Sequence, residues 1–167
     1  MKIGKFLALA VGFSALLTLT LSLFALTGTK PSLAANPKSP ADYNGLNKGK
    51  SDIYHLYLYE KNPDWNIAED GAWGKMTFGT ESFVFNGHKL TPGGAYSLIN
   101  YVDPWPGSAS VLLSSGIADA YGDIHLSGDA TDLSGKVWLV LSSDFTEGTG
   151  MIGWHQAEYL FEYNVIN

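Results

Sequence analysis

The stretch that decides the fold is residues 90–101, LTPGGAYSLINY. Its Pro92-Gly93 pair is typical of a tight turn, and the residues after the turn, 95–102, favour a β-strand. Tyr96 stands early in that strand, so its ring can pack beneath the turn while its hydroxyl bends back to a backbone group a few residues upstream. We therefore predict that Leu90, Pro92 and Tyr96 fix a corner of a β-structure.

Short strands are expected on both sides of this corner. Runs of strand-forming residues between turn residues are 53–59, 73–78, 82–85, 95–102, 111–113, 116–120, 123–127, 136–142 and 158–166. No stretch beyond residue 52 has the 3.6-residue period of a helix. Strands at this spacing are typical of two packed antiparallel sheets. The sequence predicts an all-β antiparallel β-sandwich, immunoglobulin-like or jelly-roll-like, with about eight or nine short strands.

Two of these runs predict how the layers are arranged. Residues 137–141 are apolar on both sides, so Trp138 and Val140 are expected to lie under a loop or a partner. Residues 158–166 alternate, with apolar side chains on one face and Glu158 and Glu162 on the other, as solvated charges. Four residues of strand span roughly 13 Å, whereas the acids of a glycosidase stand about 5–9.5 Å apart. The two glutamates are therefore a poor catalytic pair.

Residues 90–96 resemble the tyrosine corner of immunoglobulin-like and fibronectin type III domains, where a leucine, a proline and a tyrosine recur at this spacing. Four more strand candidates follow residue 102, where the fibronectin pattern leaves room for one. Four other segments, GAWGKM at 71–76, FVFNGH at 83–88, DPWPG at 103–107 and WLVLS at 138–142, resemble an uncharacterised family of exported prokaryotic all-β domains. This second resemblance implies a class of protein and no catalytic residues.

The first 35 residues are predicted to be a signal peptide. Lys2 and Lys5 precede an apolar stretch, 6–26, and the small residues Ser32, Ala34 and Ala35 follow it. Their spacing is that of a cleavage site, and cleavage is expected after Ala34 or Ala35. The alternative is an uncleaved anchor, because these 21 apolar-rich residues are long enough to cross a membrane. The protein is thus expected to be secreted, extracellular or held in the cell envelope.

Residues 36–51 are polar and rich in turn residues, so they are predicted to be a flexible segment ahead of the sandwich domain, residues 52–167. In an alternative reading, Tyr43 and Leu46 add a strand to a neighbouring subunit. The chain has no cysteine, which excludes disulfides and Cys-ligated metals.

Charge excludes several classes of partner. Seven lysines and all sixteen acidic residues follow residue 35, which gives that part a formal charge of −9, and the chain has no arginine. Such a surface repels phosphate and anionic headgroups, so nucleic acid is not an expected partner. A membrane is expected as a partner only if the N-terminal segment stays uncleaved. Neutral ligands and cations remain open.

Catalytic and metal-binding motifs are mostly missing from the sequence. His55, His88, His125 and His155 are isolated from one another, and the sequence contains no Gly-x-Ser-x-Gly. Acidic residues gather in the later half, where Asp119, Asp123 and Asp129 are candidate calcium ligands. Ordinary turn chemistry is the favoured explanation of these aspartates, so no cofactor is predicted, with calcium as the alternative.

The loop aromatics give the clearest functional signal. Trp105 stands between two prolines, and the stiffened loop could present its indole, together with Asp103, to a sugar or a protein. Trp65 and Trp154 occupy similar loops. The alternative is that each ring folds back to cap the core.

The leading hypothesis is therefore a non-catalytic, secreted or cell-envelope binding module for an extracellular glycan or protein, with loop aromatics as its site. Coplanar exposed tryptophans would favour carbohydrate. Two alternatives remain: a self-assembling structural subunit of a surface layer or fibre, and a hydrolase in which two of the acids or histidines converge within hydrogen-bond reach.

Overall fold

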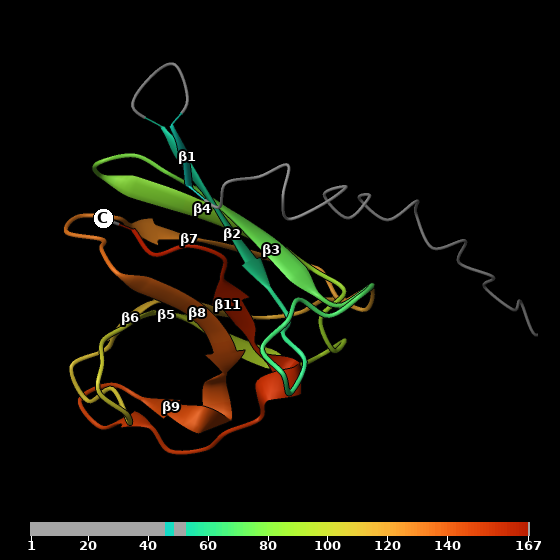
Figure 1. Cartoon of the computed structure of the whole chain (residues 1–167). Helices are drawn as coiled ribbons and strands as arrows, with labels where there is room; N and C mark the ends of the chain where they lie inside the picture. The colour runs from blue at the N-terminus through green and yellow to red at the C-terminus, as the bar shows by residue number, and fades with distance from the viewer. Residues whose placement is uncertain (1–45, 49–52, 167) are drawn as a thin grey trace, which may run out of the picture.

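The computed structural model describes residues 46–48 and 53–166 (Figure 1). Its strands are β1 (Leu46–Lys48), β2 (Tyr54–Tyr59), β3 (Trp73–Phe78), β4 (Ser82–His88), β5 (Ala95–Tyr101), β6 (Val111–Ile117), β7 (Ile124–Asp129), β8 (Lys136–Leu141), β9 (Phe145–Thr146), β10 (Gly150–Met151) and β11 (Leu160–Glu162). Two 3-10 turns, η2 (Ser142–Asp144) and η3 (Gln156–Glu158), flank the β9–β10 hairpin. Within the described ranges there is no α-helix, and so no helix that could span a membrane. The predicted signal peptide, residues 1–35, lies outside them.

Eight strands form one antiparallel sheet in the order β6-β5-β8-β11-β2-β3-β4-β7. Its first and last strands, β6 and β7, follow each other in the chain and lie side by side, so the sheet curls into a nearly closed, barrel-like sandwich. The predicted all-β antiparallel sandwich is confirmed. β1 stands off this path on the edge of β2, with Leu46 opposite Leu56, while β11 pairs with the other end of that edge at Leu58 and Tyr59.

The main core lies inside the curled sheet. Because side chains alternate along a strand, one apolar set from each strand points inward. The fully buried members are Leu56, Leu58, Met76, Phe85, Tyr96, Leu98, Val137, Leu139 and Leu160. Burying an aliphatic or aromatic side chain contributes about 1.5–3 kcal/mol, so this set stabilises a domain that contains no disulfide.

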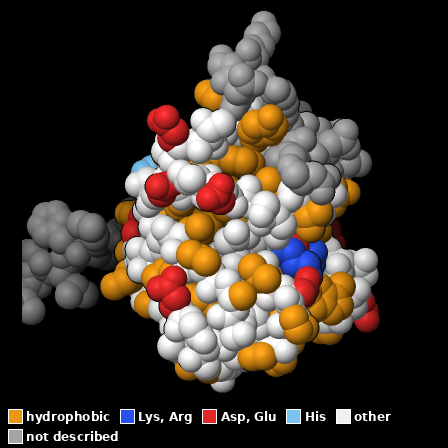
Figure 2. Space-filling view, turned by 90° about the vertical axis from the view of Figure 1, so that its left-hand side faces the viewer, with side chains coloured by type: hydrophobic (Ala, Val, Ile, Leu, Met, Phe, Trp, Pro, Cys, Tyr) orange, Lys and Arg blue, Asp and Glu red, His pale blue; other side chains and the backbone are white. Residues whose placement is uncertain are grey.

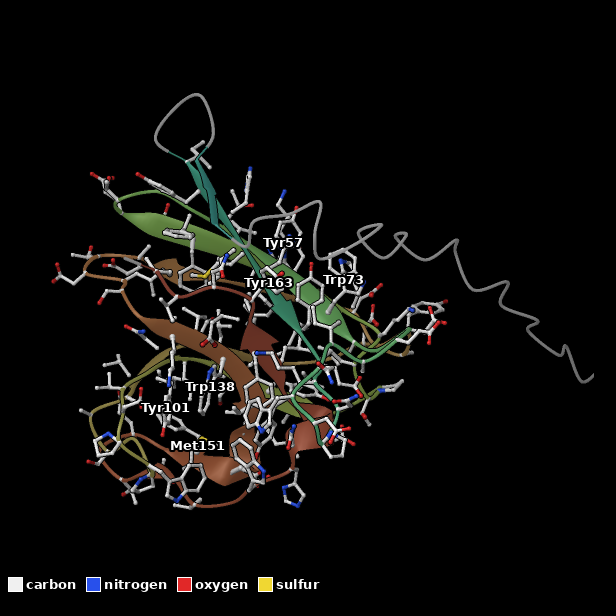
Figure 3. All side chains as sticks on the ribbon, in the orientation of Figure 1. Tyr57, Trp73, Tyr101, Trp138, Met151 and Tyr163 are labelled. Atoms are coloured by element: carbon white, nitrogen blue, oxygen red, sulfur yellow. The ribbon has the colours of Figure 1, made fainter. Side chains whose placement is uncertain are left out.

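A second, smaller core covers the outer face of β5, β8 and β11. Trp138 and Val140 lie there beneath the segment that contains the β9–β10 hairpin, with Met151 among the covering residues. The rings of Tyr101 and Trp138 stack with centroids 3.7 Å apart. In Figure 3 Tyr101, Trp138 and Met151 occupy the space between β8 and the hairpin. The prediction that a loop covers the second face of β8 is confirmed.

The turn before β5 is built as its sequence predicts. The hydroxyl of Tyr96 accepts a hydrogen bond from the backbone N–H of Thr91, 3.2 Å away, and its ring is fully buried. Leu90 is also buried, while Pro92 is exposed in the turn. Gly93 has φ +76°, a conformation in which glycine is favoured because it has no Cβ.

Two strand predictions were wrong. Runs 111–113 and 116–120 are not two strands: residues 111–117 form one strand, β6, whose register against β5 shifts at a bulge, and residues 118–120 lie beyond its end. Only residues 160–162 of the run 158–166 form a strand, because the chain leaves β8 after Phe161 and next pairs Ile166 with Gly135. The residues between bend outward, which leaves Tyr163 and Val165 40% and 43% exposed.

Candidate functional site

Three tryptophans from three different loops converge on one surface. The ring centroid of Trp154 lies 6.2 Å from that of Trp65 and 5.4 Å from that of Trp105. The exposed fractions are 40% for Trp154, 51% for Trp65 and 54% for Trp105. We call Trp65, Trp105 and Trp154 the tryptophan cluster. It unites the three indoles that the sequence singled out as loop residues.

The cluster is angular, not flat. The ring of Trp65 is tilted by 38° from that of Trp154, and the ring of Trp105 stands at 84° to it. The sequence hypothesis named coplanar tryptophans as the mark of a carbohydrate site, and these three are not coplanar. Trp105 and Trp154 pack edge to face, so the exposed aromatic surface of the cluster is not planar.

The floor of the cluster belongs to the sheet. Trp138 on β8 and Phe161 on β11 face each other across the ladder and are almost fully buried. The ring of Trp65 lies 5.1 Å from that of Phe161, and the ring of Trp154 lies 6.3 Å from that of Trp138. The exposed indoles therefore stand on side chains whose positions are fixed by strand pairing.

The loop that carries Trp65 is tied down by Asn62. The side-chain oxygen of Asn62 accepts hydrogen bonds from the N–H groups of Asp64 and Asn66, at 3.1 and 3.0 Å, and its carbonyl accepts one from Trp65 at 2.9 Å. Trp65 itself has φ +61°. A left-handed conformation costs a residue with a Cβ about 1–2 kcal/mol, so these bonds hold the indole in a position that an unrestrained loop would avoid.

The loop that carries Trp105 is anchored at several points. The Ser110 hydroxyl accepts a hydrogen bond from the N–H of Val102 at 2.9 Å, and the Pro106 carbonyl accepts one from Met151 at 2.8 Å. Gly107 lies so close to Tyr101 that a Cβ at this position would overlap the tyrosine ring. This loop is thus fastened both to β5 and to the β9–β10 hairpin.

Asp103 lies in the same loop but is already paired. Its carboxylate accepts a hydrogen bond from the ammonium of Lys136 at 2.7 Å, with 62% of the aspartate side chain exposed. The cation of Lys136 also lies 5.7 Å from the ring of Tyr101. Asp103 therefore forms a charged pair two residues before Trp105, and it is available to a ligand only together with Lys136.

Trp154 is held by Asp144, a residue that the sequence did not connect with it. The carbonyl of Asp144 accepts a hydrogen bond from the N–H of Ile152 at 2.8 Å. At Gly153 a Cβ would lie 2.5 Å from the Asp144 carboxylate, so the backbone approaches that group as closely as glycine allows. The turn 152–155 is thus clamped onto Asp144.

The carboxylate of Asp144 is buried and collects three side-chain donors. His155 Nδ1 lies 2.6 Å from Oδ2, the Tyr159 hydroxyl donates to the same oxygen, and the Ser143 hydroxyl donates to Oδ1 at 3.1 Å. Burial alone would raise the pKa of Asp144, but these hydrogen bonds outweigh it and lower the pKa below the ordinary 3.8. Burial and the bond to Asp144 raise the pKa of the Tyr159 hydroxyl. The carboxylate is therefore ionised at neutral pH.

Sequence reasoning missed this pair because Asp144 and His155 are separated by the β9–β10 hairpin. The sequence predicts an isolated surface histidine at position 155. Its side chain is indeed 60% exposed, but it is not isolated, because its Nδ1 contacts Asp144. Gly153, which precedes Trp154 and His155, was the one sign in the sequence that another group packs closely against this turn, since a glycine often marks a close backbone approach.

Glu162 contradicts the prediction of a solvated charge. It ends β11, just past the last pair with β8, and its Oε2 is buried with no hydrogen-bond partner within the described structure. Burial raises the pKa of Glu162 to about 7, although its own backbone N–H, Lys61, Lys136 and the Trp138 indole act in the opposite direction. A carboxyl that favours its neutral form thus lies beside the floor of the tryptophan cluster.

A basic side chain and a hollow border the cluster. The ammonium of Lys61 lies 5.7 Å from the ring of Trp65 and donates to the Glu162 carbonyl at 3.3 Å. A hollow of about 290 Å³ lies between the start of the Trp65 loop and η3, lined by Glu60, Lys61, Asn62, Pro63, Ala68, Gln156 and Ala157. The angular cluster therefore has a concave, partly polar neighbour.

The candidate calcium ligands do not converge on a common centre. Asp119 accepts hydrogen bonds from the N–H groups of Asp123 and Tyr121, which lower its pKa. Asp123 binds the ring of His88, and Asp129 accepts a hydrogen bond from the N–H of Thr131 at 2.6 Å. Over residues 53–166 no group of three or more acids or histidines could hold a metal ion. Each aspartate has a local structural contact.

In the space-filling view, hydrophobic side chains form patches among polar and backbone atoms, while acidic side chains stand apart from one another (Figure 2).

Comparison with protein-family models, with curated proteins and with solved structures found no match for this chain.

Proposed function

We propose that this chain is a secreted or cell-envelope binding module, without catalytic activity, whose tryptophan cluster binds a neutral extracellular carbohydrate. The observation that carries the proposal is the convergence of Trp65, Trp105 and Trp154, from three separately anchored loops, into one exposed aromatic surface. Exposed aromatic groups gathered on a rigid scaffold are typical of recognition surfaces.

The alternative of rings folded back to cap the core explains this surface less well. About half of each residue in the cluster remains exposed to solvent, whereas Trp138 and Phe161 already close the sheet beneath them. The backbone strain at Trp65 also favours a functional explanation, since strained residues are often retained at binding sites.

Charge and shape indicate which carbohydrate. The acidic chain disfavours anionic glycans, while the apolar faces of neutral sugar rings match exposed indoles. Because the indoles of Trp65 and Trp105 stand at 38° and 84° to that of Trp154, their non-planar surface suits a single flexible chain or chain end better than a flat crystalline surface. The expected ligand is a soluble, neutral oligosaccharide.

The first test replaces Trp105 by alanine. We expect at least a tenfold loss of affinity for the bound oligosaccharide, because truncating an aromatic side chain at the centre of a binding surface typically costs about 2 kcal/mol or more, and about 1.4 kcal/mol corresponds to a tenfold change. Hexasaccharides of cellulose, chitin, xylan and mannan are screened by thermal shift, and affinities are then measured by calorimetry.

Tyr121→Ala provides the matched control, because Tyr121 is a 46% exposed aromatic residue in the β6–β7 loop. It should leave the affinity unchanged. If Trp105→Ala unfolds the protein, or if none of the four oligosaccharides shifts the melting temperature, the proposal is wrong.

Strand pairing at the N-terminal side favours a second candidate, a self-assembling structural subunit. β1 adds three residues to the edge of β2, with Asn47 opposite His55. The same edge could receive this strand from a neighbouring copy, which is how exported fibres are built by strand addition.

This candidate predicts a concentration-dependent oligomer that Asn47→Pro weakens at least tenfold and Asn47→Ala does not, since proline cannot donate to a strand ladder. Analytical ultracentrifugation of both variants provides the measurement. A wild-type protein that stays monomeric throughout the micromolar range would exclude assembly by this route.

A further inference from the structure

His155 is the chain neighbour of one tryptophan of the cluster, and its ring is held by a hydrogen-bond partner. It follows Trp154 directly, 60% of its side chain is exposed, and its Nδ1 lies 2.6 Å from the Asp144 carboxylate. A histidine in a mobile surface loop would sample several rotamers. This one is restrained by a partner whose own side chain is only 6% exposed.

The chemistry of Asp144 fixes which ring nitrogen of His155 carries the hydrogen. An ionised carboxylate can only accept hydrogen bonds, so Nδ1 must be the donor in this contact. The hydroxyls of Ser143 and Tyr159 also donate hydrogen bonds to Asp144, and these bonds hold the carboxylate in its orientation toward His155. In the neutral imidazole, Nε2 is then an acceptor with a free lone pair.

We propose that His155 Nε2 accepts a hydrogen bond from a hydroxyl group of the oligosaccharide on the tryptophan cluster, with Asp144 as the positioning residue. This inference rests on the proposed function. Stacking against indoles holds a sugar ring but distinguishes poorly between sugars that differ in one hydroxyl group. A single oriented acceptor beside the rings supplies that discrimination, because a ligand that lacks the donor leaves the acceptor unpaired.

The binding test uses the oligosaccharide, among the hexasaccharides of cellulose, chitin, xylan and mannan, that gives the largest thermal shift. We expect His155→Ala to weaken its binding about tenfold or more. His125→Ala is the matched control, since His125 is also exposed and its Nδ1 also contacts a side-chain oxygen, that of Asn86. The control should bind as the wild type does.

Monodeoxy analogues of the bound sugar test the hydrogen bond itself. For the wild type, one analogue should bind about tenfold more weakly than the parent sugar. For His155→Ala, the same analogue and the parent sugar should bind equally well. If every analogue loses the same factor against both proteins, His155 makes no such bond and the inference is wrong.

Nitrogen-15 NMR of the histidine rings gives a readout that a purely structural role would not change. The free protein should show His155 with hydrogen on Nδ1, and the ligand should shift the Nε2 resonance. An Nε2–H tautomer, or an Nε2 resonance that the ligand leaves unmoved, would overturn the inference.

The outcomes separate this inference from the proposed function. If Trp105→Ala abolishes binding and His155→Ala does not, carbohydrate binding stands and the role of His155 falls. If no hexasaccharide binds, both fall together.

Discussion

Replacing Asp144 by alanine should lower the free energy of unfolding by about 3–4 kcal/mol, the largest effect we expect from a single polar side chain of this domain. The substitution leaves the buried hydroxyl of Tyr159 without its acceptor and removes the contacts to His155 and Ser143. It also opens a void beneath Gly153, whose backbone lies directly on the carboxylate. Both losses weaken the turn that carries Trp154.

Urea denaturation at pH 7 measures this effect, with Asp64→Ala as the control at an exposed aspartate, where a change within about 0.5 kcal/mol is expected. A loss below about 1 kcal/mol for Asp144→Ala would mean that the carboxylate does not hold the turn.

The pH dependence of the free energy of unfolding of Asp144→Asn independently checks that Asp144 is ionised in the folded protein. A carboxyl with a pKa lowered by folding contributes stability that is fully present above its unfolded pKa, near 3.8, and is lost as pH falls through the lower folded value. The stability difference between wild type and Asp144→Asn should therefore be constant at neutral pH and narrow below about pH 3.8. A difference that widens in acid would contradict this assignment.

The sequence predicted the sandwich because its signals are local. Alternation along a strand and the Pro92-Gly93 turn depend on residues a few positions apart, and the corner joins Thr91 to Tyr96, only five positions later. The same local reasoning placed Trp65, Trp105 and Trp154 in loops.

The sequence did not show that the three loops of the tryptophan cluster meet. Their convergence depends on β11 lying between β8 and β2, an order that alternation does not encode. The contact between Asp144 and His155 likewise requires the β9–β10 hairpin to fold back over β8, so no spacing rule could reveal it.

Glu162 shows how a local rule fails. Strict alternation through residues 158–166 would expose this side chain, but β11 ends at Glu162 and the chain departs from β8. A carboxyl at the end of a broken ladder, next to the buried Phe161, loses its solvent without gaining a partner for Oε2. Long-range packing thus decided the environment of the residue.

Glu162→Gln should stabilise the protein above pH 7 and leave it almost unchanged near pH 4. The pKa of Glu162 is raised by burial from 4.5 to about 7, so the folded state binds a proton that the unfolded state releases. The favourable contribution of this neutral carboxyl is fully present below pH 4.5 and is lost as pH rises through about 7.

Glutamine mimics the neutral form at every pH. The advantage of the variant should therefore grow between pH 4.5 and 7 and level off above. It should reach no more than about 3.5 kcal/mol, because the pKa of Glu162 changes from 4.5 to about 7 on folding and a tenfold change in a proton-binding constant corresponds to about 1.4 kcal/mol. Urea denaturation of wild type and variant at intervals from about pH 4 to 8.5 measures it, and Glu81→Gln makes the same chemical change at an exposed site.

A variant less stable than wild type at pH 8 would mean that Glu162 is ionised and that its attraction to Lys61 and Lys136 exceeds the cost of burial. In that case the two lysines would stabilise the ionised carboxylate enough to keep Glu162 charged at pH 7. Since Glu162 follows Phe161 in the floor of the tryptophan cluster, the sign of this one difference also decides whether that floor carries a buried charge when a ligand arrives.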